Sequence, residues 1–269
     1  MELNYEDTGA GTPVIILHGL FGALGNWRAV ARALSRDYRV ITVDLRNHGA
    51  SPHTNSLDYV DMADDVIDLM DRLGLPSAHL IGHSLGGKLA MLVADRDPER
   101  VRRLIVVDIA PRAYPLWHKD VFDALAAVDL KRLRSRADAV RMMAPHLFDV
   151  AVREFLATNL KHEAQGWAWR FNLPVLAAEY PKTSEMPALS GFYVGQALFL
   201  RGAHSSYIQE DDLPQIKRAF PGACLVTLHD AHHWPHIEAP DEFLANVRGF
   251  LAEGPLGVHG EPLDDPISA

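Results

Sequence analysis

The feature that most constrains this chain is an alternation of short apolar runs with longer segments of helical spacing. The longer segments, in which apolar residues recur at helical spacing, are Trp27 to Leu34, Met62 to Leu73 and Lys88 to Asp95. This order is typical of parallel strands joined by crossover helices. The sequence therefore predicts an α/β fold, with a mostly parallel sheet flanked by helices. The apolar runs, which read as strands buried on both faces, are Val14–Leu17, Val40–Val43, Ala78–Ile81 and Leu104–Val107.

The second half of the chain resumes this pattern only after a long interval. Two further strands are predicted at Ala197–Leu200 and Leu225–Leu228, and a closing helix at Pro240–Leu251. Residues 111–187 carry no comparable strand signal and read as several helices rich in Arg, Trp and Met. We expect a core formed by residues 1–110 and 188–252, with residues 111–187 inserted as a helical lid over the carboxyl edge of the sheet. Residues 253–269 are rich in proline and glycine, which predicts a loosely held C-terminal extension.

Composition excludes several classes of function. The 269 residues carry a formal net charge of -9, so phosphate backbones are repelled and no nucleic-acid partner is expected. Cys224 is the only cysteine, which rules out an internal disulfide. The chain opens without the basic and apolar stretch of a secretory signal, and no apolar run reaches the length of a membrane span. These observations predict a cytoplasmic protein.

A nucleophile motif lies between a predicted strand and a predicted helix. Gly82-His83-Ser84-Leu85-Gly86 matches G-x-S-x-G, in which a sharp turn lifts the serine hydroxyl above the sheet. The strand that ends at Ile81 and the helical segment after Gly86 give the motif its required context. The alternative is that Ser84 only caps a helix, but this reading explains neither glycine. The sequence therefore predicts Ser84 as a nucleophile.

A serine hydroxyl needs an imidazole as its base, and one histidine cluster follows the last predicted strand. It contains His229, His232, His233 and His236, and spacing alone does not choose among them. A metal site built from His233, His236 and Asp230 is an alternative. The proline between His233 and His236 speaks against the regular helix that such ligands usually occupy.

The acid that orients the histidine is the least obvious member of the site. Many enzymes of this architecture carry it in a G-x-x-D turn after the strand that follows the lid, but that turn reads Gly202-Ala203-His204-Ser205 here. One strand earlier, Asp108 directly follows a buried run, where a carboxylate needs a partner such as histidine. Asp108 is therefore favoured. The rival carboxylates are Glu210, Asp211 and Asp212.

Ester hydrolysis also requires donors for the oxyanion that forms on the attacked carbonyl. One is expected from the backbone amide of Leu85, directly after the nucleophile. The segment His18-Gly19-Leu20-Phe21-Gly22 follows the first predicted strand, and its glycines allow close approach to a substrate. We expect the Leu20 amide to be the second donor, with Phe21 in reserve. The alternative is a plain strand-to-helix turn.

Several segments resemble the α/β-hydrolase superfamily, and in particular the esterases of the bacterial YbfF type, which are relatives of the abhydrolase-11 group. The superfamily resemblance rests on the His18 loop, the Ser84 elbow and Asp44 to Ser51. The narrower resemblance rests on three further segments, Val107 to Pro111, Trp169 to Leu173 and Arg201 to Ile208.

This resemblance implies roles for particular residues. It implies Asp108 as the acid, and alignment of Ala231 to Pro240 with the A-G-H-W-x-H-x-E-x-P motif implies His233 as the catalytic histidine. His232 replaces the glycine of that motif, which could narrow the pocket or alter the loop. The resemblance further implies a helical lid and activity on acyl esters or thioesters.

The prediction is a serine esterase or thioesterase that acts on small to medium acyl substrates through an acyl-enzyme and needs no cofactor or metal. Trp169, Phe171 and Trp234 are expected to line the substrate pocket, with Trp117 and Trp167 as further apolar lining of the lid. Two alternatives remain open because fold does not decide chemistry. They are another reaction of this fold, such as carbon–carbon bond hydrolysis or cofactor-free haloperoxidation, and a non-enzymatic ligand-binding role.

Overall fold

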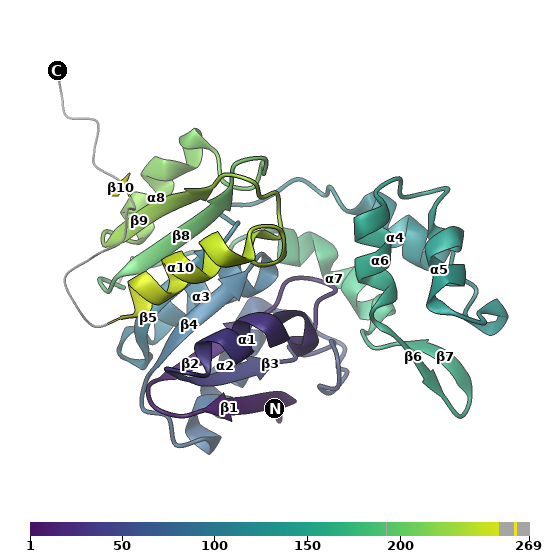
Figure 1. Ribbon diagram of the computed structural model, residues 1–269, viewed down its shortest axis with the longest axis horizontal. Helices are drawn as coiled ribbons and strands as arrows, with labels where there is room; N and C mark the ends of the chain where they lie inside the picture. The colour runs from purple at the N-terminus through teal and green to yellow at the C-terminus, as the bar shows by residue number, and fades with distance from the viewer. Residues whose placement is uncertain (192, 253–260, 263–269) are drawn as a thin grey trace.

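A computed structural model describes residues 1–191, 193–252 and 261–262 (Figure 1). The described residues form an eight-stranded sheet in the order β1-β3-β2-β4-β5-β8-β9-β10. The strands of this sheet are β1 (Tyr5–Gly9), β2 (Pro13–Leu17), β3 (Arg39–Val43), β4 (Ala78–His83), β5 (Val101–Val107), β8 (Ala197–Gly202), β9 (Ala223–Leu228) and β10 (Glu261–Pro262).

All six predicted strands are present, and they pair in parallel as β3-β2-β4-β5-β8-β9. The α/β fold with a mostly parallel sheet is thereby confirmed. The two edge strands, β1 and β10, are antiparallel to their neighbours. β1 had no apolar signal in the sequence because all five of its residues are exposed. Of the predicted C-terminal extension, only Glu261 and Pro262 lie within the described residues.

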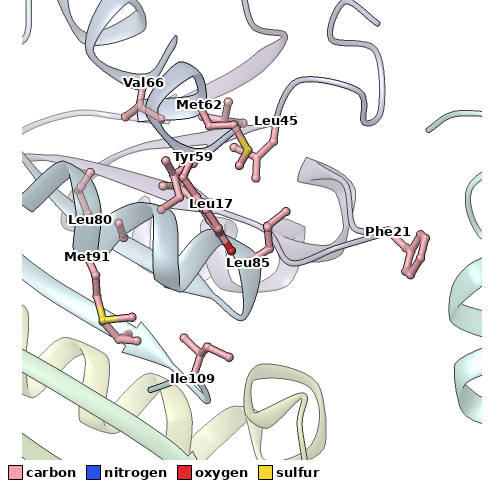
Figure 2. Packing of buried hydrophobic residues seen from close by; sticks show 14 of the residues in the cluster. Leu17, Phe21, Leu45, Tyr59, Met62, Val66, Leu80, Leu85, Met91 and Ile109 are labelled. Carbon is pink, nitrogen blue, oxygen red and sulfur yellow. The ribbon is translucent and has the colours of Figure 1, made fainter. Parts of the chain in front are cut away.

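Helices cover both faces of the sheet, so the inner strands are buried on both sides. Val14 and Ile16 of β2 pack in the cluster that includes α1 and α10, whereas Ile15 and Leu17 pack in the cluster that includes α2 and α3. Figure 2 shows part of the second cluster, including Met62 of α2. The helices of the core are α1 (Arg28–Leu34), α2 (Tyr59–Arg72), α3 (Leu85–Arg96), α8 (Leu213–Ala219), α9 (Pro235–Glu238) and α10 (Pro240–Leu251).

The segment between β5 and β8 forms a lobe beside the sheet (Figure 1). Its helices are α4 (Lys119–Ala126), α5 (Arg136–Met143), α6 (Val150–Ala157) and α7 (Leu173–Ser184). The sequence predicted helices alone here, and that expectation was incomplete. β6 (Leu160–Glu163) and β7 (Gly166–Trp169) form an antiparallel hairpin. Only Leu160 and Trp169 of these short strands are buried, so the strands show no buried apolar run.

The parallel arrangement brings the predicted site residues to one edge of the sheet. Loops that follow the carboxyl ends of β2, β4, β5 and β9 carry Leu20, Ser84, Asp108 and His233, respectively. Because the carboxyl ends of parallel strands share an edge, these distant segments converge there. Among the described residues, no helix is both long enough and apolar enough to cross a membrane.

Candidate active site

Ser84 occupies a strained turn between β4 and α3. Its φ of 52° and ψ of -117° lie outside the usual regions for a residue with a side chain. The Ser84 amide donates to the carbonyl of Val107 at 3.1 Å, which ties the turn to the end of β5. A side chain at position 86 would place its Cβ 2.4 Å from the carbonyl oxygen of Leu17, so Gly86 allows the turn to pack against β2. This geometry matches the nucleophile elbow of the sequence motif.

Asp108 is fully buried directly after β5, in a backbone conformation with φ of 51°. Its Oδ1 accepts the amide of Gly202 at 3.1 Å, and its Oδ2 accepts hydrogen bonds from the Ser205 hydroxyl and from His233 Nδ1, the latter at 2.8 Å. A buried carboxylate is tolerated when hydrogen bonds satisfy both of its oxygens. Two of the three donors to Asp108 therefore come from the end of β8 and the loop after it, where many enzymes of this architecture carry the aspartate.

The rival acids are engaged elsewhere. Glu210 forms an ion pair with Arg201 at 2.7 Å, and Asp212 forms one with Arg112 at 2.6 Å. Asp211 is exposed in the short 3-10 helix Glu210–Asp212. None of the three contacts His233.

His233 is held on three sides. Its Nδ1 hydrogen donates to Asp108, which leaves Nε2 with a lone pair. The backbone carbonyl of His233 accepts a 2.7 Å hydrogen bond from Nε2 of His83. The phenol ring of Tyr207 stacks on the imidazole, with ring centroids 3.7 Å apart and planes 13° apart. The ring is therefore fixed in orientation and in the tautomer that a general base requires.

The other histidines of the cluster have separate surroundings. His229 pairs with Glu242 at the surface, while His236 is buried and stacks on Trp27 at 4.0 Å. Burial, together with the nearby His233, lowers the pKa of His236 to about 3. The side chain of His232 is 64% exposed and is not among the cavity-lining residues, so it does not narrow the cavity. Within the described part of the chain, no three side chains of His, Cys, Asp or Glu group as metal ligands.

The loop after β2 approaches the nucleophile closely. A Cβ at position 19 would lie 3.2 Å from the Ser84 Cβ, so Gly19 makes this approach possible. The Phe21 amide donates to Nε2 of His48 at 3.3 Å, which engages the reserve donor elsewhere. Among the described residues, the backbone amides of Leu20 and Leu85 donate to no hydrogen-bond acceptor. Leu85 is the first residue of α3, where amides have no partner within the helix.

A cavity of about 380 Å³ opens at this edge, between the core and the inserted lobe. Ser84, Leu20 and Leu85 line it together with His233. Trp234 and Trp117 also line it, as expected from the sequence. Side chains of α4, α6 and α7 or of their flanking residues complete the wall, namely His118, Val121, Val152, Phe155, Tyr180 and Thr183.

Two expected pocket residues lie elsewhere, which corrects the interpretation of the lobe. Trp169 and Phe171 stack on each other at 5.1 Å and are buried in the core, and neither lines the cavity. Phe171 packs edge-on against Phe21, so the Trp169–Phe171 pair joins the lobe to the loop after β2. Trp167 of β7 packs against His162 across the hairpin and is also absent from the cavity wall. Aromatic composition alone does not show which face of a lobe a ring occupies.

Four residues of the site were not recognised from the sequence. In the sequence, Ser205 was noted only because it occupies the aspartate position of the G-x-x-D turn. Tyr207 was included only within the segment Arg201 to Ile208. His118 lies between Tyr180, whose hydroxyl is 2.6 Å from its Nδ1, and Tyr207, whose hydroxyl is 3.4 Å from its Nε2. Burial lowers the pKa of His118 to about 4. Lys88, one helical turn beyond Ser84, also lines the cavity.

Known proteins agree with this architecture. A family model described as the alpha/beta hydrolase fold matches residues 12–240, and the chain therefore belongs to that family. The sn-1-specific diacylglycerol lipase ABHD11 of Mus musculus is 39% identical over 261 residues, covering 94% of this chain and 85% of the relative. Esterase YbfF of Escherichia coli is 37% identical, covering 89% of this chain and 93% of the relative. A solved marine microorganism esterase superposes with a TM-score of 0.90 at 34% identity, covering 93% of this chain and 99% of that one. The protein is a hydrolase, and the resemblance to YbfF-type esterases is confirmed.

Proposed function

We propose that the protein is a serine ester hydrolase in which Ser84, His233 and Asp108 form the catalytic triad. The observation that carries this proposal is the 2.8 Å contact of the buried Asp108 with Nδ1 of His233, a residue that lines the same cavity as Ser84. The names of the relatives point to ester substrates, and the elbow geometry of Ser84 fits a nucleophile.

The chemistry follows from these positions. His233 Nε2 removes the proton of the Ser84 hydroxyl as the Ser84 oxygen attacks the substrate carbonyl. The amides of Leu20 and Leu85 stabilise the oxyanion of the tetrahedral intermediate. His233 then protonates the leaving alcohol or thiol, and an acyl group remains on Ser84. Water, activated by His233, attacks this acyl-enzyme and releases the acid, and Ser84 regains its proton. Throughout, Asp108 stabilises the imidazolium form of His233.

The inserted lobe fits the role of a lid, as the sequence predicts for residues 111–187. The lobe supplies much of the apolar cavity wall, including Val121, Val152 and Phe155. An apolar wall of this kind excludes water and holds an acyl chain through buried surface. Thioester hydrolysis uses the same steps and remains part of the proposal. The cytoplasmic location predicted from the sequence stays a prediction.

The test is the Ser84→Ala variant. We expect this variant to lose turnover of esters with butanoyl or longer acyl groups. We also expect it to lose labelling by a fluorophosphonate probe. Ser206→Ala is the matched control, because Ser206 is an exposed serine on the loop after β8. Labelling that persists in Ser84→Ala and disappears in another serine variant would show that the nucleophile lies elsewhere. Esters and acyl thioesters of equal chain length, assayed side by side, identify the preferred leaving group.

A further inference from the structure

Lys88 places a buried cation on the wall of the cavity. It lies on α3, four residues after Ser84, and only 2% of the residue is exposed. Four helical residues correspond to a rise of about 6 Å, so Lys88 lies one turn below the nucleophile. Its Nζ donates to the carbonyls of Ser184 at 2.7 Å and Glu185 at 2.8 Å, at the end of α7. The same Nζ lies 4.9 Å from the centre of the Tyr114 ring.

Within the described chain, only the exposed side chain of Glu185 offsets this charge through space, and it does so without an ion pair. Among the described residues, no Asp or Glu side chain forms an ion pair with Lys88 Nζ. An ammonium has three N–H donors, and the two carbonyls use two of them. Carbonyl groups and an aromatic face offset only part of the cost of burying a cation. Burial lowers the pKa of Lys88 to about 7, although the charge of Glu185 acts in the opposite direction.

The other charged groups of the cavity do not compensate for Lys88. It is the one Lys or Arg among the described residues that line the cavity. Two carboxylates line it, Asp120 and Asp149, and both belong to the inserted lobe. Asp120 accepts the amide of Val121, and Asp149 accepts the amide of Ala151 at the start of α6. Both are therefore engaged at helix N-termini rather than with Lys88.

We propose that Lys88 binds an anionic group of the substrate, so that the site prefers esters carrying a carboxylate on one of their two halves. This inference rests on the proposed ester hydrolase function and specifies its substrate class. A carboxylate that enters the cavity accepts the remaining N–H of Lys88 and supplies the direct ion pair that Lys88 does not form with the described residues. The apolar walls hold the intervening methylene groups. A substrate without such a group leaves the cation only partly compensated.

The experiment compares pairs of esters that differ only in charge. In one pair, monobutyl glutarate is matched with the butyl ester of glutaric acid monoamide. In the other, the charge is on the alcohol half, as in the pentanoate ester of 4-hydroxybutanoate and its amide. We expect the carboxylate member of at least one pair to have a kcat/KM about tenfold to a hundredfold higher, the range for a hydrogen bond to a charged group. The pair that shows the preference identifies which half of the ester reaches Lys88.

Variants of Lys88 separate recognition from a structural role. In Lys88→Met the ratio of carboxylate to amide kcat/KM should fall to about one, and Lys88→Arg should retain part of it. If Lys88 only fastens the end of α7, Lys88→Met lowers kcat/KM for both esters and leaves their ratio unchanged. That result, or a wild-type ratio near one in both pairs, would overturn the proposal.

Two further measurements keep the inference testable if the enzyme assay fails. If Lys88→Met does not fold, competitive inhibition of the wild type by the monoamide of glutaric acid, which carries one carboxylate, and by the neutral diamide gives the same comparison. If no ester is hydrolysed, the proposed function fails, but calorimetric binding of the monoamide against the diamide still tests for an anion site. Equal affinities for the two compounds would then exclude such a site.

Discussion

The loops after β5 and after β8 lie side by side and make different contributions to the same carboxylate site. The first carries Asp108 in a left-handed backbone conformation, and the second carries Ser205 and the Gly202 amide, both of which donate to Asp108. The second is the loop where a G-x-x-D turn would place the acid. A carboxylate and a hydroxyl have thus exchanged places relative to that arrangement. Asp108 directly follows its strand, whereas Ser205 lies three residues after the end of β8. The three donors hold the carboxylate of Asp108 in one orientation.

This difference shows that the position of the acid in space matters more than the loop that supplies it. β5 and β8 are neighbouring parallel strands, so their carboxyl ends are adjacent. A carboxylate from either loop reaches Nδ1 of a histidine that follows β9. The remaining loop then provides hydrogen-bond donors instead of charge.

The largest effect is expected for Asp108→Asn. Loss of the orienting carboxylate should lower kcat for ester hydrolysis by about 10⁴, because an amide at this position favours the wrong tautomer of His233. Steady-state kinetics on a butyl ester measures the change. Asp211→Asn is the matched control and should retain normal turnover, since Asp211 is exposed and distant from His233. A normal rate in Asp108→Asn would exclude Asp108 as the acid.

An exchange of the two side chains tests the comparison directly. Asp108→Ser alone should lose activity to a similar extent as Asp108→Asn. Adding Ser205→Asp should restore at least about tenfold of kcat, because the new carboxylate lies within reach of the same imidazole. A double variant no faster than Asp108→Ser would show that the loop after β8 does not aim a carboxylate at His233.

A smaller loss is expected for Ser205→Ala. This change removes one of the three donors to Asp108, and hydrogen bonds to charged groups are worth about 1.5 to 3 kcal/mol. We expect kcat to fall by about tenfold to a hundredfold while KM changes little. Ser206→Ala on the same loop is the control. Equal rates for the two variants would mean that Ser205 only fills space.

The stacked ring of Tyr207 should contribute less again. Aromatic stacking is worth about 0.5 to 1.5 kcal/mol, so Tyr207→Leu should lower kcat/KM by about twofold to tenfold. Tyr207→Phe keeps the stack on His233 and should recover most of this loss. The pH profile of kcat/KM in both variants reports whether the ring acts through the base. If Phe is as poor as Leu, the hydroxyl near His118 carries the effect instead.

The last prediction concerns pH and stability rather than catalysis, through the neighbouring His236. Its folded-state pKa of about 3 lies below the unfolded value of 6.5, so between these values the unfolded chain binds more protons. Stability contributed by neutral His236 is therefore present above pH 6.5 and is lost as the pH falls. At pH 5 the penalty is about 2 kcal/mol. Urea unfolding of His236→Phe at pH 7.5 and pH 5 should show a correspondingly smaller decrease than the wild type.

Sequence patterns located the parts of the fold that depend on burial. Six strands and the helix Pro240–Leu251 were predictable because a strand covered on both faces is apolar at successive positions. β1 and the β6–β7 hairpin were not, because β1 is exposed throughout and the hairpin strands bury only Leu160 and Trp169, so neither has that pattern. In the same way, Trp169 and Phe171 were assigned to the pocket because composition shows that a ring is apolar but not which cavity or core it faces.

The sequence by itself determined the parallel sheet, the elbow at Ser84 and the candidate positions for its partners, since these follow from local patterns of burial and turn chemistry. Only the tertiary structure decided which groups meet. It showed that Asp108, Ser205 and His233 converge, that Tyr207 stacks on the imidazole, and that the buried Lys88 forms no ion pair with a carboxylate of the described residues. These contacts join residues up to 125 positions apart, so no short pattern records them. They arise because parallel strands bring the ends of distant segments to one edge.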